Sequence, residues 1–408
     1  MPLKIRDGRS MELLRAGHDE GARVFQAPHG LAVLDPELSQ ALNATNFGDT
    51  TLPDRLVDLL RGRKSPEIAW KEIRTGWAAQ LKILGEAEHM AALDGRLEAL
   101  IDARLDQPLD LPVAIQEIFT HALIPTVMAD LTDGEWARVR KDQDYKLMRL
   151  MRAVPREETR SELIRSAILQ MRCSWVARKV LKQRAKGKRP RQLDLADTIV
   201  DFLPRLGMDR ASFAVTTVLT AIAGPPGAVA VCMLLELVRR PEWSNRMAEE
   251  LSGVDLEAFH RAPTRTAPVT YRFVREVLRV WSSPLVLTRV ANMPLTADDE
   301  TLQPGDNFHL CPYFVHRHAK MWEDPETFDP DRWLPGSGRG PAQANAYVPF
   351  GWAPTSCIGA SLGTHELMLL CRQFTTRYRI DAIDPDAVEV VMASVPLPVG
   401  FRGTWVRR

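Results

Sequence analysis

The sequence lacks several features that define whole classes of protein. Its five cysteines are scattered and odd in number, which excludes a disulfide framework and indicates a reducing compartment, so we expect a cytoplasmic protein. Lys and Arg total 53 against 52 for Asp and Glu, and a net charge of +1 excludes nucleic-acid binding driven by bulk charge. Residues 1–22 hold no apolar core for a signal peptide, and we expect no membrane-spanning segment.

Cofactor motifs of the common redox proteins are absent as well. There is no G-x-G-x-x-G dinucleotide site after a strand, no cysteine cluster for an iron–sulfur centre and no repeat of fixed period. What is present is an ordinary globular composition, with 45% hydrophobic and 26% charged residues.

Periodicity predicts a single domain, 1–408, that is mainly α with small β-sheets. A short β-containing region ends near residue 50, a helical body covers about 51–284, and strands alternate with Pro- and Gly-rich segments over about 285–408. Helical patterns cover 69–84, 87–105, 160–186, 208–240, 270–281 and 359–378, and strand patterns cover 29–35, 285–292 and 307–310. The basic run 182–191 (KQRAKGKRPR) indicates either a solvated loop or a docking site for an acidic partner.

Cys357 has the most distinctive surroundings, in VPFGWAPTSCIGASLGTHELMLL. It follows a loop rich in Gly and Pro and directly precedes a predicted helix. Free backbone N–H groups and the positive end of the helix dipole favour a thiolate there, and a thiolate can bind a soft metal or haem iron. The plain alternative is a buried structural cysteine.

Three weaker motifs accompany it. Glu276 and Arg279 form E-x-x-R on one face of a helix, or else an ordinary surface ion pair. Arg332 lies in the Pro-rich segment 316–334, here called the meander, and could form a bidentate contact with Glu276. Trp70 and Arg74 form W-x-x-x-R, one helical turn apart, or else belong to an amphipathic surface helix.

Taken in order, these motifs resemble those of the cytochrome P450 family, from about residue 29 to the C-terminus and most specifically over 236–374. The resemblance implies a cytochrome P450-like fold that binds haem b (iron protoporphyrin IX) with Cys357 as the axial thiolate ligand of iron. From the segment itself, Gly359 would allow close backbone approach and Phe350 would shield the sulfur from water. Glu276, Arg279 and Arg332 match a structural triad of the family. Trp70, Arg74 and Arg289 match residues that bind the haem propionates, and His316 matches a structural histidine.

A haem protein of this kind oxidises a small molecule with electrons from elsewhere. Since no flavin or iron–sulfur motif is present in the chain, the resemblance implies a separate ferredoxin- or flavodoxin-type electron donor that docks on the face around Cys357. No nucleic-acid or membrane partner is expected.

The haem loop departs from the family pattern at two positions. Where the family has Gly four residues before the cysteine and Arg or His two residues before it, this chain has Ala353 and Thr355. Thr355 cannot make a charged contact with a propionate, so haem retention would depend more on Arg74 and Arg289.

A larger departure lies in the long helix expected above the haem, here called the distal helix. The family has Ala/Gly-Gly-x-acid-alcohol there, and the corresponding catalytic positions are Ala223, Gly224, Pro225, Pro226 and Gly227. Neither Pro226 nor Gly227 can transfer a proton in place of the acid and the alcohol.

The two prolines also remove two backbone donors and free the carbonyls of Ala221 and Ile222, so the helix must kink or break. Three interpretations are open: a tolerated kink, proton supply by ordered water or a polar substrate, and no activation of dioxygen at all.

The resemblance favours P450-type oxidation of a small apolar or peptide-like molecule in specialised metabolism. Loss of the acid–alcohol pair favours instead a haem-thiolate enzyme that uses peroxide or catalyses a redox-neutral dehydration or rearrangement. A non-catalytic P450-like partner protein is a third possibility, against which Cys357, Glu276 and Arg279 count.

Overall fold

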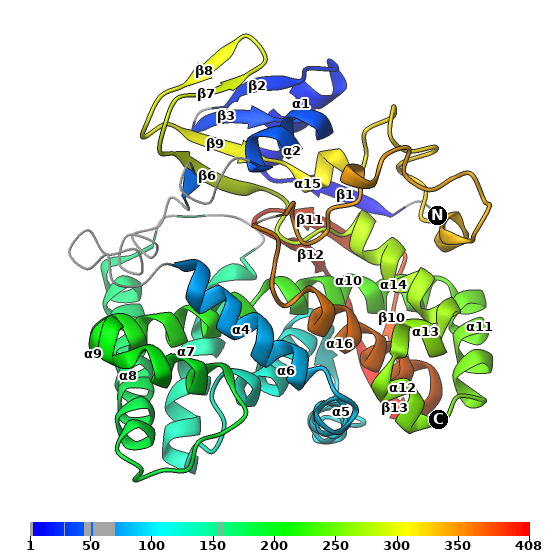
Figure 1. Ribbon diagram of the computed structural model, residues 1–408. Helices are drawn as coiled ribbons and strands as arrows, with labels where there is room; N and C mark the ends of the chain where they lie inside the picture. Colours follow the sequence, from blue (N-terminus) through cyan, green and yellow to red (C-terminus); the bar gives the residue numbers. More distant parts are fainter. Residues whose placement is uncertain are drawn as a thin grey trace.

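The computed structural model describes residues 3–27, 29–44, 50–51, 70–152, 156, 158–353 and 355–408. In Figure 1 a body of helices fills the lower part of the molecule, and the N-terminal strands lie above it beside the strands that follow residue 285. The predicted mainly α fold with small β-sheets is confirmed.

Five of the six helical patterns in the sequence agree with described helices to within a few residues at most ends. The sixth, 208–240, covers Pro225–Arg239 and the part of Leu195–Ile222 that follows Gly207, whose backbone is not helical (φ 73°, ψ 159°). Leu111–Val127, Asp133–Leu150 and several shorter helices were not predicted individually.

In chain order the helices of the described ranges are α1 (Arg9–Asp19), α2 (Pro36–Ala44), α4 (Trp70–Leu84), α5 (Ala87–Asp102), α6 (Leu111–Val127), α7 (Asp133–Leu150), α8 (Arg160–Ala185), α9 (Leu195–Ile222), α10 (Pro225–Arg239), α11 (Pro241–Ser252), α12 (Leu256–Arg261), α13 (Pro263–Thr266), α14 (Pro268–Val280), α15 (Pro312–Val315) and α16 (Ala360–Arg372). Short 3₁₀ turns follow at η1 (Pro330–Trp333) and η2 (Ala344–Ala346), and a π turn, η3 (Gln373–Arg377), extends α16.

Capping explains why two of these helices begin where they do. The Thr159 hydroxyl accepts a hydrogen bond from the Glu162 backbone N–H, and the Glu162 carboxylate accepts one from the Thr159 N–H. Thr132 and Glu135 form the same capping box at the start of α7. Each box satisfies two backbone donors that a helix N-terminus leaves open.

Four small sheets occur in the described part of the chain. One has the order β1–β11–β12, one β10–β13–β5, one β2–β3–β9–β6–β4, and β7 pairs with β8. The strands are β1 (Lys4–Asp7), β2 (Val24–Ala27), β3 (Gly30–Val33), β4 (Thr50–Thr51), β5 (Leu109–Asp110), β6 (Leu287–Ala291), β7 (Leu295–Ala297), β8 (Glu300–Leu302), β9 (Asn307–Leu310), β10 (Tyr378–Ile383), β11 (Glu389–Met392), β12 (Pro396–Val399) and β13 (Arg402–Arg407). In the five-stranded sheet, β9 joins the N-terminal strands to β6, pairing parallel to β3 and antiparallel to β6.

The core is built around α6, α10, α14 and α16. Their buried apolar side chains form one large cluster that also takes in α5 and the C-terminal strands. A second cluster joins α4, α8 and α9 to the C-terminal end of α6. Since α16 starts three residues after Cys357, this core fixes the base of the cysteine loop.

The distal helix is broken, as the sequence predicts. Helix α9 ends at Ile222 and α10 begins at Pro225, with Gly224 between them at non-helical backbone angles (φ −165°, ψ −69°). Both prolines occupy the first turn of α10, where no intrahelical N–H is required. The interruption is therefore a helix end followed by a new helix start rather than a kink.

Our expectation that no segment is long and apolar enough to span a membrane is wrong. No Asp, Glu, Lys or Arg occurs between Arg210 and Glu236, and Leu195–Arg239 reaches the required length and apolarity. Within the fold, 67% of its most apolar stretch is buried. The central helix of a water-soluble core has the same composition, so this stretch by itself does not indicate a membrane span.

The basic run 182–191 is only partly a solvated loop. Its first four residues belong to α8, and Arg184 is buried and forms two 2.7 Å hydrogen bonds with Asp194. Arg189 and Arg191 also bind carboxylates of the chain. The other three cations of the run, Lys182, Lys186 and Lys188, are exposed, so a docking site for an acidic partner stays a prediction.

Close packing of α6 on α10 requires glycine at position 227. A Cβ atom there would lie 3.0 Å from both Cα and Cγ of Gln116. We expect Gly227→Ala to lower the free energy of unfolding by about 1–3 kcal/mol through overpacking. Gly95→Ala, at an exposed position of α5 with open space around it, should instead stabilise by about 0.5–1 kcal/mol. Urea unfolding of both variants checks this, and equal effects would contradict the packing argument.

Candidate functional site

Cys357 differs from every other cysteine in the chain because it is exposed, whereas Cys173, Cys232, Cys311 and Cys371 are buried. Its backbone N–H donates to the Phe350 carbonyl oxygen at 2.8 Å, which closes the loop. This exposure argues against the alternative of a buried structural cysteine.

The environment of the Cys357 sulfur has three components. The Gly359 backbone N–H donates to the sulfur and the positive charge of Arg74 acts on it, and both lower its pKa. Burial among protein atoms works in the opposite direction and is the larger effect, so the net pKa of Cys357 is raised. The Gly359 N–H thus favours the thiolate, as expected of free backbone donors, and burial outweighs it in the free protein. Coordination to a metal would displace the thiol proton, because a metal-bound cysteine is a thiolate.

Arg74 reaches the cysteine loop from α4. Its guanidinium donates to the Ser356 carbonyl oxygen, beside Cys357. Burial lowers the pKa of Arg74, and the negative charge of a Cys357 thiolate partly offsets this lowering. The structure thus brings together Arg74 and Cys357, which are 283 positions apart in the sequence. Helix α4 begins at Trp70, whose side chain lies outside the described residues.

Arg289 is a buried cation on β6. Only 9% of the residue is exposed, its guanidinium donates to the carbonyl of neighbouring Thr288, and burial lowers its pKa. Among the described residues no carboxylate pairs with it. A buried guanidinium of this kind suits an anionic group such as a haem propionate, because charge is costly to bury without a partner. The available side chains therefore fit the haem that the sequence implies.

The predicted structural triad is present and fully buried. Arg279 donates to both carboxylate oxygens of Glu276, at 2.7 and 3.0 Å, and Arg332 donates to the same carboxylate at 3.1 Å. The three residues are 0%, 0% and 2% exposed, so the alternative of a surface ion pair for Glu276 and Arg279 is wrong.

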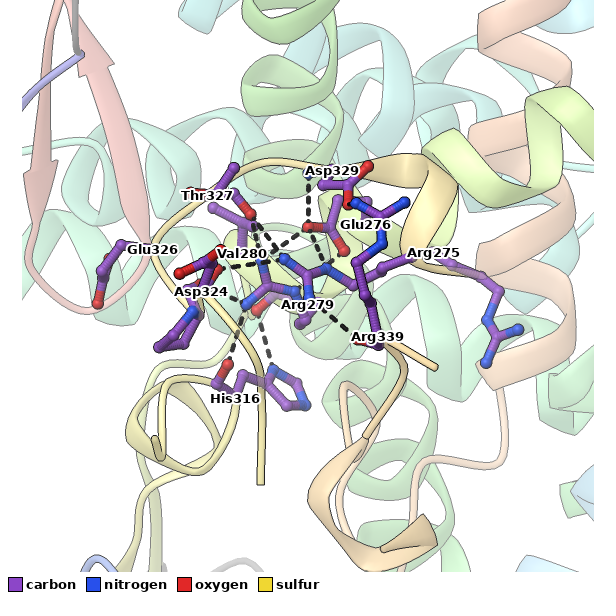
Figure 2. A network of polar contacts seen from close by, with 12 residues as sticks. Arg275, Glu276, Arg279, Val280, His316, Asp324, Glu326, Thr327, Asp329 and Arg339 are labelled. Carbon is purple, nitrogen blue, oxygen red and sulfur yellow. Dashed lines mark hydrogen bonds and ion pairs between the residues drawn. The ribbon is translucent and has the colours of Figure 1, made fainter. Parts of the chain in front are cut away.

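Backbone groups complete this network. Arg279 donates to the carbonyls of His316, Pro325 and Thr327, and Glu276 accepts from the Asp329 N–H. Figure 2 shows Glu276 and Arg279 at the centre, with Asp329 and His316 on opposite sides of them. Both terminal nitrogens of the Arg279 guanidinium thus bind helix α14 to the meander.

His316 connects the triad to the cysteine loop. Its Nδ1 lies 3.0 Å from the Arg279 carbonyl oxygen, and its Nε2 accepts from the Val348 N–H at 2.8 Å. Burial and the charge of Arg279 lower its pKa well below the ordinary value, so the ring is neutral. Its structural role, which the sequence indicated, is confirmed. The bond to Val348, nine residues before Cys357, was not predictable from the motif.

Two further supports of the site have no sequence signature. Asn43 of α2 donates to the carbonyls of Trp352 and Ala353, and its amide oxygen accepts from the Thr355 hydroxyl at 2.7 Å. The Trp333 indole N–H donates to Glu276 at 3.0 Å. Thr355, which replaces a charged residue of the family pattern, thus holds the loop to α2.

Gly224 and Gly227 both pack closely against other helices. A Cβ at Gly224 would meet the Leu150 side chain at 2.2 Å, and one at Gly227 would meet Gln116. Assignment of Ala223, Gly224, Pro226 and Gly227 to the distal catalytic positions stays a prediction.

Removing Arg279 should release the meander from α14. Arg279→Ala leaves the buried Glu276 carboxylate without its bidentate partner, and we expect a loss of about 3–5 kcal/mol in the free energy of unfolding. Haem incorporation should fall with it. Haem-to-protein stoichiometry and urea unfolding measure both. Arg261→Ala, which breaks an exposed i,i+4 pair with Glu257, is the control and should change stability by less than about 0.5 kcal/mol. A fully loaded, stable Arg279→Ala protein would refute the role of the triad.

A buried acid lies nine residues after Cys357. Glu366 of α16 is 0% exposed, and neither carboxylate oxygen has a partner among the described residues. Burial raises its pKa well above the ordinary value, and the nearby charge of Arg96 offsets this only in part. Glu366 is therefore protonated at neutral pH.

This acid should make the fold weaker as pH rises. Above about pH 4.5 the unfolded chain ionises Glu366 while the folded chain does not, so stability falls by up to about 1.4 kcal/mol per pH unit. Glu366→Gln removes that loss and should be increasingly more stable than the unmodified protein from pH 5 to pH 8. Urea unfolding at several pH values tests this, with exposed Glu88→Gln as control. Parallel pH profiles for Glu366→Gln and the unmodified protein would contradict a buried neutral acid.

Comparison with known proteins agrees with this geometry. The cytochrome P450 family profile matches residues 163–398. A probable cytochrome P450 4aa1 of Drosophila melanogaster is 28% identical over 44% of this chain and 36% of its own length. Pentalenene oxygenase of Streptomyces avermitilis is 28% identical over 45% of this chain and 40% of its own length. The chain thus aligns with well under two thirds of the length of these curated relatives.

Solved structures match over nearly the whole chain. A zebra fish cytochrome P450 with progesterone superimposes with a TM-score of 0.75 over 98% of this chain and 99% of its own, at 19% identity. The haem domain of cytochrome P450DA gives a TM-score of 0.77 over 99% and 94%, at 16% identity. At these identities the likeness concerns the fold.

Proposed function

Because this chain belongs to the cytochrome P450 family, we propose that it is a haem-thiolate oxidoreductase acting on a small apolar or peptide-like molecule. The observation that carries this proposal is Cys357, the exposed cysteine held beside Arg74 and tied through Val348 and His316 to the buried triad. One relative is named pentalenene oxygenase, and this name supports an oxygenase activity.

Haem b would lie against Cys357, with Arg289 and Arg74 placed to bind its propionates and Phe350 beside the sulfur. Thiolate-ligated haem supplies oxidation chemistry, because electron donation from sulfur favours cleavage of the O–O bond. The chain's own part is to hold the sulfur: the Gly359 N–H and the Arg74 charge stabilise its anionic form once the proton has left.

Electrons would arrive from a ferredoxin- or flavodoxin-type donor docked near the cysteine loop. A groove of about 460 Å³ opens there between α14, α16 and residues 347–351. Tyr271, Phe350 and His365 are among its lining residues, and Phe350 belongs to the cysteine loop itself. Electron transfer through this face would follow a short path to the sulfur.

The protein would work in the cytoplasm, without nucleic acid and without a membrane. The balanced charge and the four buried, unpaired cysteines support this, as does the burial of most of the apolar stretch in Leu195–Arg239.

A second candidate function is supported by the distal helix. With Pro226 and Gly227 at the positions of the acid and the alcohol, the chain offers no titratable side chain of its own there. A haem-thiolate enzyme that uses peroxide, or that carries out a redox-neutral dehydration or rearrangement, needs no such pair.

Turnover under three conditions separates the two. Candidate substrates are incubated with surrogate electron donors under air, with peroxide alone, and without oxygen or peroxide. We expect product only with electrons and air, at a rate in the ordinary enzymatic range of about 1–10³ per second for a good substrate. Turnover that persists without oxygen would exclude the favoured function, and turnover with peroxide alone would favour the second.

A further inference from the structure

A cavity of about 320 Å³ lies where helices α11 and α12 meet the C-terminal end of α16. Figure 1 shows α11 and α12 at one edge of the helical body, beside that end of α16. At about 30 Å³ per water molecule, the cavity has room for about ten waters, or for one organic molecule of about ten non-hydrogen atoms. Its size is therefore that of a small-molecule site.

Most of the cavity wall is apolar. Leu251 of α11 and Phe259 of α12 belong to the main hydrophobic core, and Val254 packs against that core. Leu256, which is 42% exposed, lies at the wall as well. Water makes few hydrogen bonds at such a surface, whereas an apolar chain or ring gains free energy by leaving water. The wall thus favours an apolar occupant.

The three hydroxyl groups at the wall are already used within the chain. Ser252 of α11 donates to a backbone carbonyl oxygen of its own helix at 2.8 Å. Thr375 and Thr376, on the π turn η3, each donate to a carbonyl oxygen at the end of α16 at 2.7 Å. A π turn is rare and occurs mostly at functional sites. These hydroxyls leave the recognition of a polar group to another side chain.

Arg372, the last residue of α16, is that side chain. It is only 9% exposed, and of its three nitrogens only Nη2 donates to another described residue, the carboxylate of Asp94. Its Nε is buried and has no partner in that part of the chain. A buried donor without an acceptor is costly, so an acceptor inside the cavity would stabilise the guanidinium.

Asp94 does not use up the positive charge of Arg372. Its carboxylate also accepts from the Gln373 amide at 2.6 Å and lies 2.9 Å from Nε2 of His260. Because three groups share one negative charge, the guanidinium keeps part of its attraction for a second anion. The bond to Asp94 also fixes the guanidinium in place, so binding a ligand costs little further ordering.

The cavity is separate from the cysteine loop. Helix α16 has 13 residues, and at about 1.5 Å per residue its two ends lie about 20 Å apart. Cys357 precedes the first end, and Arg372 forms the other. An occupant of the cavity is therefore not the molecule that reacts beside the Cys357 sulfur.

We propose that this cavity binds a small carboxylic acid, with the carboxylate on Arg372 and an apolar chain or ring against Leu251 and Phe259. A carboxylate makes a stronger hydrogen bond with a guanidinium than a neutral oxygen does. The bound acid joins α11, α12 and α16, and it stabilises the folded protein by mass action. The site does not depend on the function proposed above.

Calorimetric titration of the haem-loaded protein tests the site with octanoate and 3-phenylpropanoate, which match the cavity in size. We expect one acid to bind per chain, and 1-octanol to bind at least about tenfold more weakly because it lacks the charge. Ala248→Leu puts a larger side chain into the cavity and should weaken acid binding at least about tenfold, while the matched control Ala248→Ser should not. Absence of binding by both acids, or equal binding by Ala248→Leu and the unmodified protein, would overturn the proposal.

The guanidinium has its own test. Arg372→Gln removes the charge and should reduce the preference for octanoate over 1-octanol to less than about twofold. Arg377→Gln, five residues later and outside the cavity wall, breaks an ion pair with Glu98 and should keep the full preference. Haem content and circular dichroism show which variants fold, and the two Ala248 variants decide alone if Arg372→Gln does not. A folded Arg372→Gln protein that keeps the full preference would overturn the assignment of the carboxylate to Arg372.

Discussion

A single buried carboxylate, that of Glu276, joins helix α14 to the meander. Glu276 accepts hydrogen bonds from two guanidinium groups, one indole and one backbone N–H, and none of its surface is exposed. Taking an acid and two arginines out of water is expensive, and the arrangement is stable only because every strong donor and acceptor in it is satisfied. These contacts join helix α14 to the meander. Through His316 they also fix the segment that leads to Cys357, so the three parts form one rigid unit.

That rigidity makes sense of the cysteine loop. In the free protein, burial raises the pKa of the Cys357 thiol and so favours its protonated form. The Gly359 N–H, the Arg74 charge and the fixed loop help only the anion, so they act when a metal binds. Arg289 likewise awaits a charged ligand: it is a buried cation, and no carboxylate among the described residues pairs with it. These residues fit the haem iron group that the family binds.

Sequence motifs located most residues of the triad and of the cysteine loop. Spacing alone predicted that Glu276 and Arg279 share a helix face, that Cys357 precedes a helix, and that two prolines break the distal helix. The sequence could not predict the contacts that join distant segments of the chain. Asn43 meets residue 355 from the other end of the chain, and no local pattern marks an asparagine as the support of a loop. Gln116 and Gly227 are equally unrelated in sequence, since only helix packing brings them together. The sign of the Cys357 pKa shift depended on how much protein surrounds the sulfur, which composition does not reveal. The long uncharged stretch was misjudged because its Thr, Gly and Pro residues hide its apolar character.

Carbon monoxide binding to the reduced, haem-loaded protein gives the most direct test of the account. The position of the Soret band then depends on which protein atom ligates the iron. If Cys357 sulfur ligates the iron, the unmodified protein should show the strong red shift of a thiolate-bound haem, and Cys357→Ser should lose it while Cys311→Ser keeps it. A protein that stays colourless after reconstitution, or a Soret band that is the same with and without Cys357, would contradict the central claim.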